Sequence, residues 1–168
     1  RGIVHREAPE DILTNKANLV SVMTANNEVG TIQPIKELCD FAHSKGVMFH
    51  TDAVQAVGHI PIDVKDLGID FLPASAHKFN GPKGVGFLYI RRGVEILPYL
   101  CGGSQEKGLR AGTENVAAIV GMAAALQKNI NNLLANIKYV RNLEAELLTL
   151  LSQTGIDFKR NGAGEHVP

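Results

Sequence analysis

The chain has 168 residues, 45% of them hydrophobic, and its 17 acidic side chains balance its 17 basic ones. This size and composition are typical of one soluble globular domain with a sizeable core. Zero net charge gives no reason to expect nucleic acid or an anionic membrane as a partner. No apolar run approaches the roughly 20 residues of a membrane-spanning helix, and the N-terminus lacks a signal-peptide apolar region, so we expect a cytoplasmic protein.

Strand-like and helix-like segments alternate from the start. Residues 18–24 are predicted to form a strand, and residues 34–45 a helix that begins with Pro34 and ends before Gly46. A second strand is predicted over residues 47–51. Strand, helix and strand joined by short links favour a parallel α/β sheet.

The pattern continues with a short helical stretch near residues 64–67 and a third strand over residues 69–74. A fourth strand is predicted over residues 84–91. So few residues separate it from the third that the two can pair antiparallel. The expected fold class is therefore α/β, with a mostly parallel sheet and flanking helices.

The composition changes after residues 102–103. Residues 114–131 are Ala-rich and predict a helix, which breaks near residues 131–132 before a second helix. Apolar residues recur every three or four positions on this second helix, at Leu134, Ile137, Val140, Leu143 and Leu147. Residues 155–162 are predicted to be the first strand of a further unit.

The two cysteines, Cys39 and Cys101, stand far apart and lack CxxC spacing. Two reduced thiols are therefore expected, rather than a disulfide or a zinc site. Cys39 falls on the apolar side of the predicted helix and is assigned to the core.

The segment between the third and fourth strands, residues 75–84, holds Lys78 just past a strand end. An amine placed there can be desolvated, which lowers its pKa and makes it a nucleophile toward an aldehyde. Lys78 is thus a candidate Schiff-base lysine, although most loop lysines are merely solvated. Lys83 is a weaker candidate, because Pro82 and Gly84 place it in a turn.

Ligands of open α/β sheets bind outside the carboxyl ends of the parallel strands. Polar residues follow all three predicted parallel strands, namely Asn26, Asn27 and Glu28 after the first, Asp52 and Gln55 after the second, and Ser75, His77 and Lys78 after the third. An amide, a carboxylate, a hydroxyl, an imidazole and an amine are therefore expected at one edge.

An aldehyde cofactor with a pyridine ring and a phosphate would use this whole set. Asp52 would pair with the protonated ring nitrogen. Asn27 and Gln55 would contact the ring oxygen, and Ser75 and His77 would hold the phosphate beside the lysine.

Each residue also has a purely structural interpretation. Asp52 can cap the short helix after it, Asn27 can be a turn residue, Gln55 can lie on a helix surface, and Ser75 can cap a loop.

A metal site is a further alternative. His50 and Asp52 alternate within one strand, and with His77 they could act as zinc or iron ligands. This hypothesis leaves Lys78 and Asn27 without a role. The remaining histidines carry no spacing signal and are expected at the surface; they are His5, His43, His59 and His166.

Four linked motifs resemble those of the cysteine desulfurases in order and spacing. They lie in residues 25–30, in residues 50–58, in residues 75–84 and in residues 102–113. The resemblance runs from about Asn15 to Gln127. It implies the aspartate-aminotransferase fold, pyridoxal 5'-phosphate as cofactor, and a homodimer that takes sulfur from L-cysteine, leaves alanine and a persulfide, and supplies acceptors such as iron–sulfur scaffolds.

The resemblance implies the same residue roles as the strand-end argument and adds three. Lys78 would form the Schiff base and move protons at the substrate carbon. Thr113 would reach the phosphate of the neighbouring subunit, and Gly112 before it suits a close backbone approach. Arg110 either helps at the same edge or is simply solvated.

The sequence departs from the family by omission. Neither Cys39 nor Cys101 matches the family's persulfide-forming cysteine, which lies in a C-terminal small domain, and an N-terminal segment with a further histidine is also missing. We therefore expect a fragment that is inactive alone. Residues 1–130 would be part of the large cofactor domain, and residues 131–168 the connecting helix and the start of the small domain.

Two alternatives share much of this pattern. Selenocysteine lyase uses the same cofactor chemistry, and a truncated α/β dimerisation module would be non-catalytic. A nucleotide-binding Rossmann domain is disfavoured, because no GxGxxG opens a helix after the first strand.

Overall fold

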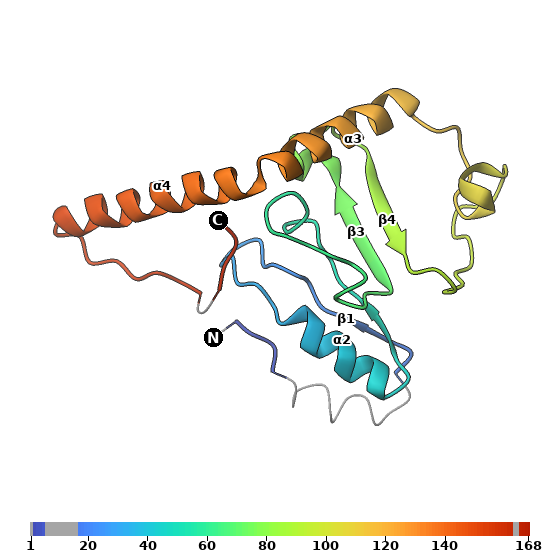
Figure 1. The fold of residues 1–168 in the computed structure, drawn as a ribbon, viewed down its shortest axis with the longest axis horizontal. Coiled ribbons are helices and arrows are strands. Elements are labelled where there is room, and N and C mark those ends of the chain that lie inside the picture. Colours follow the sequence, from blue (N-terminus) through green and yellow to red (C-terminus); the bar gives the residue numbers. More distant parts are fainter. Residues whose placement is uncertain (1, 6–16, 163–164) are drawn as a thin grey trace.

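The computed structural model describes residues 2–5, 17–162 and 165–168. In these residues four strands form one sheet in the order β1-β2-β3-β4 (Figure 1). The strands are β1 (Leu19–Ser21), β2 (Met48–His50), β3 (Phe71–Ser75) and β4 (Gly86–Ile90). β1, β2 and β3 are parallel, and β4 is antiparallel to β3. The mostly parallel sheet and the antiparallel pairing of the fourth strand are both confirmed.

Helix α2 (Ile35–Ser44) follows β1 and confirms the predicted helix. Pro34 precedes its first turn, where a missing N–H costs nothing, and Gly46 with φ of 71° follows its end. The helix packs against the sheet beside β2 (Figure 1). Its inward face is fully buried and consists of Ile35, Leu38, Cys39, Phe41 and Ala42.

Helices α3 (Val116–Asn131) and α4 (Leu133–Gln153) are separated at Asn132, where the sequence predicts a break. The Asn132 side chain donates to the carbonyl of Lys128 at 2.8 Å, which caps the end of α3. Helix α3 packs over the turn that follows β3, whereas α4 runs away from the sheet (Figure 1). The apolar stripe of α4 is largely exposed, as at Leu134 and Leu147.

Two predicted elements are wrong. Residues 64–67 form a single turn rather than a helix. The Asp63 side chain accepts hydrogen bonds from the backbone N–H groups of Lys65 and Asp66, as a helix N-cap does, but Gly68 with φ of 74° ends the stretch after one turn. Residues 156–162 are irregular rather than a strand, since no described strand pairs with their backbone. A strand needs such a partner to satisfy its backbone groups.

Three of the histidines expected at the surface are partly buried and have partners. His43 pairs with Asp70, and His59 is described with the site below. His166 lies 3.0 Å from Glu144 and holds the pKa of that carboxyl below its usual value. His5 is exposed, as expected.

Asp70 is fully buried at the start of β3 and joins three elements. Its Oδ2 lies 2.7 Å from His43 Nε2 of α2 and accepts a hydrogen bond from the backbone N–H of Phe49 in β2 at 2.7 Å. Its Oδ1 lies 2.6 Å from Arg91 Nη2, just after β4. A buried carboxylate is tolerated here because both oxygens have partners, and the Arg91 guanidinium supplies an opposite charge.

Replacing Asp70 with alanine should lower the free energy of unfolding by about 3 kcal/mol, since the change strands a buried N–H, the Arg91 guanidinium and the ring N of His43. The expected loss of stability is at the low end of the range for a buried ion pair, because the side chains of His43 and Arg91 are partly exposed to solvent. Urea unfolding measures it. Asp40→Ala is the control, since in the described part of the chain the Asp40 carboxylate pairs with Lys36 alone, at the surface, and its loss should barely shift the midpoint. Equal midpoints for the two variants would contradict this role of Asp70.

Candidate functional site

The segments after the three parallel strands run side by side at the carboxyl edge of the sheet. Beyond β1 and β2, the Thr24 N–H donates to the Asp52 carbonyl at 2.7 Å. The hydroxyls of Thr24 and Thr51 lie 2.7 Å apart, and both residues are buried. The register is therefore maintained past the ends of the strands, and the polar residues that follow them share one edge as the sequence predicts.

Asp52 is partly buried at this edge. Its Oδ1 accepts a hydrogen bond from the backbone N–H of Val54 at 2.9 Å, so the side chain caps the turn that follows β2. In the described part of the chain this is the only hydrogen bond of the Asp52 side chain. Its second oxygen is thus left for a ligand, and the capping interpretation and the binding interpretation are compatible.

Lys78 lies in a short 3-10 helix, Ala76–Phe79, that begins where β3 ends. Ala76 and Phe79 are fully buried while Lys78 is partly exposed, so the turn is anchored on both sides of the lysine. Asn80 closes the turn in the left-handed region with φ of 64°, which asparagine tolerates better than most residues. The Gly81 N–H then donates to the Ala76 carbonyl at 2.8 Å.

Ser75 precedes this turn and His77 lies within it. The Ser75 hydroxyl oxygen lies 2.9 Å from His77 Nδ1, and His77 is exposed. One of the two groups donates to the other, so the pair offers an anion the donor that remains, either the Ser75 hydroxyl hydrogen or the His77 Nε2–H.

His59 is the site residue that the sequence reasoning missed. Its Nε2 lies 2.8 Å from the backbone carbonyl of Lys78. Gly58 beside it has φ of +80°, and a Cβ built on it would lie 2.8 Å from the Cβ of Phe79. The turn after β2 therefore packs directly on the lysine turn. The one feature of the sequence that could have indicated this contact is Gly58, because a glycine permits a close approach of two backbones.

Two further candidates reach the edge with less support from contacts. Asn27 is exposed in the turn after β1, and the neighbouring Asn26 is the residue whose side chain caps that turn. Gln55 is partly buried in the turn after Asp52. No hydrogen bond among the described residues links either of them to Lys78.

Thr113 lies elsewhere in this chain. It lines a pocket of about 850 Å³ beside β4, together with Gly84 and Phe87. Its side chain is exposed. The structure does not bring Thr113 to the Lys78 turn of its own chain.

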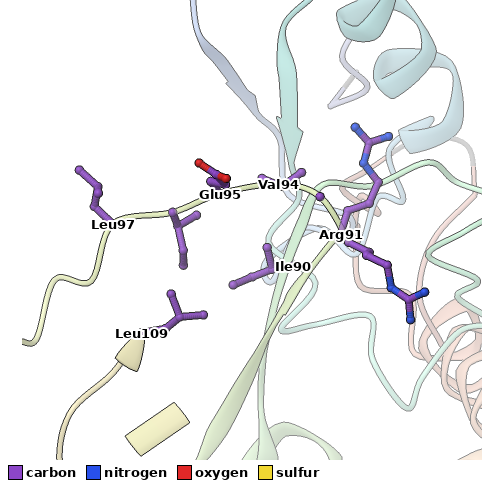
Figure 2. Close-up of a pocket in the computed structure, with 9 residues that line it drawn as sticks. Ile90, Arg91, Val94, Glu95, Leu97 and Leu109 are labelled. Atoms are coloured by element: carbon purple, nitrogen blue, oxygen red, sulfur yellow. The ribbon is translucent and has the colours of Figure 1, made fainter. Parts of the chain in front are cut away.

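A second hollow, of about 650 Å³, lies beside the end of β4 (Figure 2). Ile90, Val94, Leu97 and Leu109 surround it (Figure 2). Because β4 is antiparallel to β3, Ile90 pairs with Phe71 at the amino end of β3. This hollow is therefore at the opposite edge of the sheet from Lys78.

Neither a metal cluster nor an activated thiol is found at the edge in the described residues. No three His, Cys, Asp or Glu side chains gather there to hold a metal ion, and His50 Nδ1 instead lies 2.8 Å from the Ser21 hydroxyl. Cys39 is in the core as predicted, and burial raises the pKa of its thiol to about 11. Cys101 is exposed. Within the described residues, no helix combines the length and apolar character needed to cross a membrane.

Comparison with known proteins gives consistent matches. Residues 1–160 match the family described as Aminotransferase class-V. The cysteine desulfurase IscS of Clostridium botulinum is 48% identical over 161 residues, which cover 96% of this chain and 41% of that protein. The chain thus spans less than half the length of such relatives.

Solved structures share the fold. A structure titled NifS-like protein superposes with a TM-score of 0.88 and 44% identity, over 92% of this chain and 43% of its own. A structure titled SspA in complex with cysteine has a TM-score of 0.72 and 40% identity, over 75% and 37% of the two chains. The expected α/β fold, with a mostly parallel sheet, is that of these proteins.

Proposed function

Because this chain belongs to the class-V aminotransferase family, we propose that it is the pyridoxal-phosphate-binding core of a cysteine desulfurase, which converts L-cysteine to L-alanine and an enzyme persulfide. The identity to cysteine desulfurase IscS over nearly the whole chain supports this reaction. The observation that carries the proposal is the Lys78 turn at the end of β3, at the same edge of the sheet as Asp52.

The groups at this edge fit the cofactor. Pyridoxal phosphate has an aldehyde, a basic ring nitrogen, a ring oxygen and a phosphate. The edge offers the Lys78 amine, the Asp52 carboxylate with one uncommitted oxygen, and the Ser75–His77 pair. When bound, the cofactor supplies an electron sink for bonds at the substrate's α-carbon.

Each proposed role follows from the chemistry of the side chain. The Asp52 carboxylate pairs with the ring nitrogen and keeps it protonated, while the Val54 N–H fixes its orientation. The Ser75 hydroxyl and the His77 ring bind the phosphate oxygens. Asn27 and Gln55 are proposed donors to the ring oxygen.

Lys78 has two proposed tasks. Its Nζ would hold the aldehyde carbon of the cofactor, and the same amine would move the proton at the α-carbon of cysteine. A partly buried position suits both tasks, because it limits water while leaving the amine accessible.

We further propose a homodimer in which Thr113 contacts the phosphate of the partner subunit, and sulfur transfer to acceptors such as iron–sulfur scaffold proteins. The exposed position of Thr113, away from the Lys78 turn of its own chain, supports the first of these.

Product analysis tests the proposed reaction. The protein that carries this chain, supplied with pyridoxal phosphate, L-cysteine and a thiol reductant, should yield alanine and sulfide in equal amounts. Turnover of L-selenocysteine with none of L-cysteine would instead indicate a selenocysteine lyase. Formation of the keto acid would indicate amino-group transfer, and the absence of both product and bound cofactor would favour a non-catalytic module.

A further inference from the structure

The backbone carbonyls of the lysine turn have unusual partners. A 3-10 helix leaves its last carbonyls without partners in the helix, so other groups must satisfy them. In the turn Ala76–Phe79, the Lys78 carbonyl is bound by His59 Nε2 at 2.8 Å. The next carbonyl, that of Phe79, accepts a hydrogen bond from Asn129 Nδ2 at 2.8 Å. Two side chains from two different elements thus hold two consecutive peptide groups.

The protonation of His59 and the orientation of Asn129 follow from these acceptors. A carbonyl only accepts, so His59 must carry a proton on Nε2, as a neutral ring or as an imidazolium. Asn129 is buried, and its Nδ2 also donates to the Ala125 carbonyl at 2.9 Å. Both hydrogens of its amide are therefore used, and the side chain has one possible orientation.

Packing leaves the turn little freedom to move. Phe79 is fully buried, and Gly58 lies so close that a methyl group there would come within 2.8 Å of the Phe79 Cβ. Gly81 is similarly restricted, since a Cβ on it would lie 2.9 Å from the Ala76 Cβ. Hydrogen bonds and close packing together fix the backbone on both sides of Lys78.

We propose that His59 and Asn129 are positioning residues, which bind the carbonyls of Lys78 and Phe79 and thereby aim the Lys78 amine along the edge shared with Asp52. This inference rests on the proposed function, which assigns cofactor binding to the Lys78 amine. His59 belongs to the same turn segment that begins at Asp52, so it connects the two chemical groups of the site through a few residues of backbone. Asn129 anchors the opposite side of the turn to α3.

The test compares donors with shape-matched non-donors in the protein that carries this chain. His59→Phe keeps a ring but donates nothing, whereas His59→Gln keeps an amide donor. Asn129→Leu removes the donor in nearly the same volume. Asn132→Leu is the matched control, because the one hydrogen bond of the Asn132 amide among the described residues is to the Lys128 carbonyl of the helix that it caps.

Two measurements are made on each variant. Hydrogen exchange of the Gly81 amide, whose bond to Ala76 closes the turn, is measured in the cofactor-free protein. The rate at which Lys78 captures pyridoxal phosphate is followed by trapping with borohydride. We expect about tenfold faster exchange and about tenfold slower capture for His59→Phe and Asn129→Leu. For His59→Gln and Asn132→Leu, the exchange rate and the capture rate should stay near those of the wild type. In the two variants that lose a donor, kcat should fall without a matching rise in KM.

The outcomes separate this inference from the proposed function. If the wild type captures the cofactor at Lys78 and both non-donor variants do so at the same rate with the same exchange, the positioning role is wrong and the function stands. If the wild type captures none, the function fails, and exchange in the cofactor-free protein still decides the positioning role. Should Asn129→Leu fail to fold, the His59→Phe and His59→Gln pair decides it.

Discussion

Replacing Lys78 with alanine should reduce alanine formation from L-cysteine by about 10⁴-fold or more, because both covalent capture of the cofactor and proton transfer at the substrate are lost. Circular dichroism should remain that of the wild type, since the Lys78 side chain is partly exposed and the turn is anchored by its buried neighbours Ala76 and Phe79. Bound cofactor should also become removable by dialysis.

Lys83→Ala is the matched control for this prediction. Lys83 lies five residues further along the same loop, is exposed, and precedes Gly84 in the turn before β4. Its removal should leave turnover within a factor of two or so, in line with an exposed surface substitution. Full activity of Lys78→Ala, or loss of activity in Lys83→Ala instead, would show that the amine has been assigned to the wrong lysine.

Replacing Asp52 with asparagine should lower kcat by about 10²- to 10³-fold, the range typical of removing one preorganised electrostatic partner. Asparagine preserves the shape and can still accept the Val54 N–H through its oxygen, so the turn after β2 should persist. What is lost is the negative charge that keeps the ring nitrogen protonated. Steady-state kinetics with saturating cofactor measure the effect.

Asp63→Asn is the matched control for this prediction, because it removes the charge of a capping carboxylate that lies away from the site. The Asp63 carboxylate caps its own turn through the N–H groups of Lys65 and Asp66, and these bonds hold its pKa below the usual value. Asp63 therefore has the same local role as Asp52 without the position at the carboxyl edge. Because asparagine keeps the cap in both variants, comparable losses of kcat would mean that the position of Asp52 at the carboxyl edge is not what matters.

Local patterns were sufficient to predict the sheet and much of the candidate site. Pro34 and Gly46 bounded α2, and the short link between the third and fourth strands correctly allowed an antiparallel β4. The strand-end rule placed the segments after β1, β2 and β3 at one edge, because parallel strands bring their carboxyl ends together. The roles assigned to individual residues there, and the division of the chain near residue 131, remain predictions.

The contacts that the sequence reasoning missed share a physical cause, which is that a sequence does not show long-range hydrogen bonds. His59 binds the Lys78 carbonyl, 19 residues away in the sequence, and Asn129 binds the Phe79 carbonyl, 50 residues away. No periodic pattern in the sequence indicates either contact. Asp70 was read as part of an apolar strand, although its buried carboxylate is matched by His43 and Arg91 from other elements. The predicted helix at residues 64–67 failed for a local reason instead, because Gly68 with φ of 74° ends the stretch after one turn.

The most direct test of the cofactor site is reduction with borohydride after reconstitution with pyridoxal phosphate, followed by peptide mapping by mass spectrometry. We expect one pyridoxyl group per chain, located on Lys78 and absent from Lys78→Ala. An adduct on Lys83, adducts spread over surface lysines, or no adduct in a folded protein would contradict a cofactor site at the carboxyl edge of this sheet.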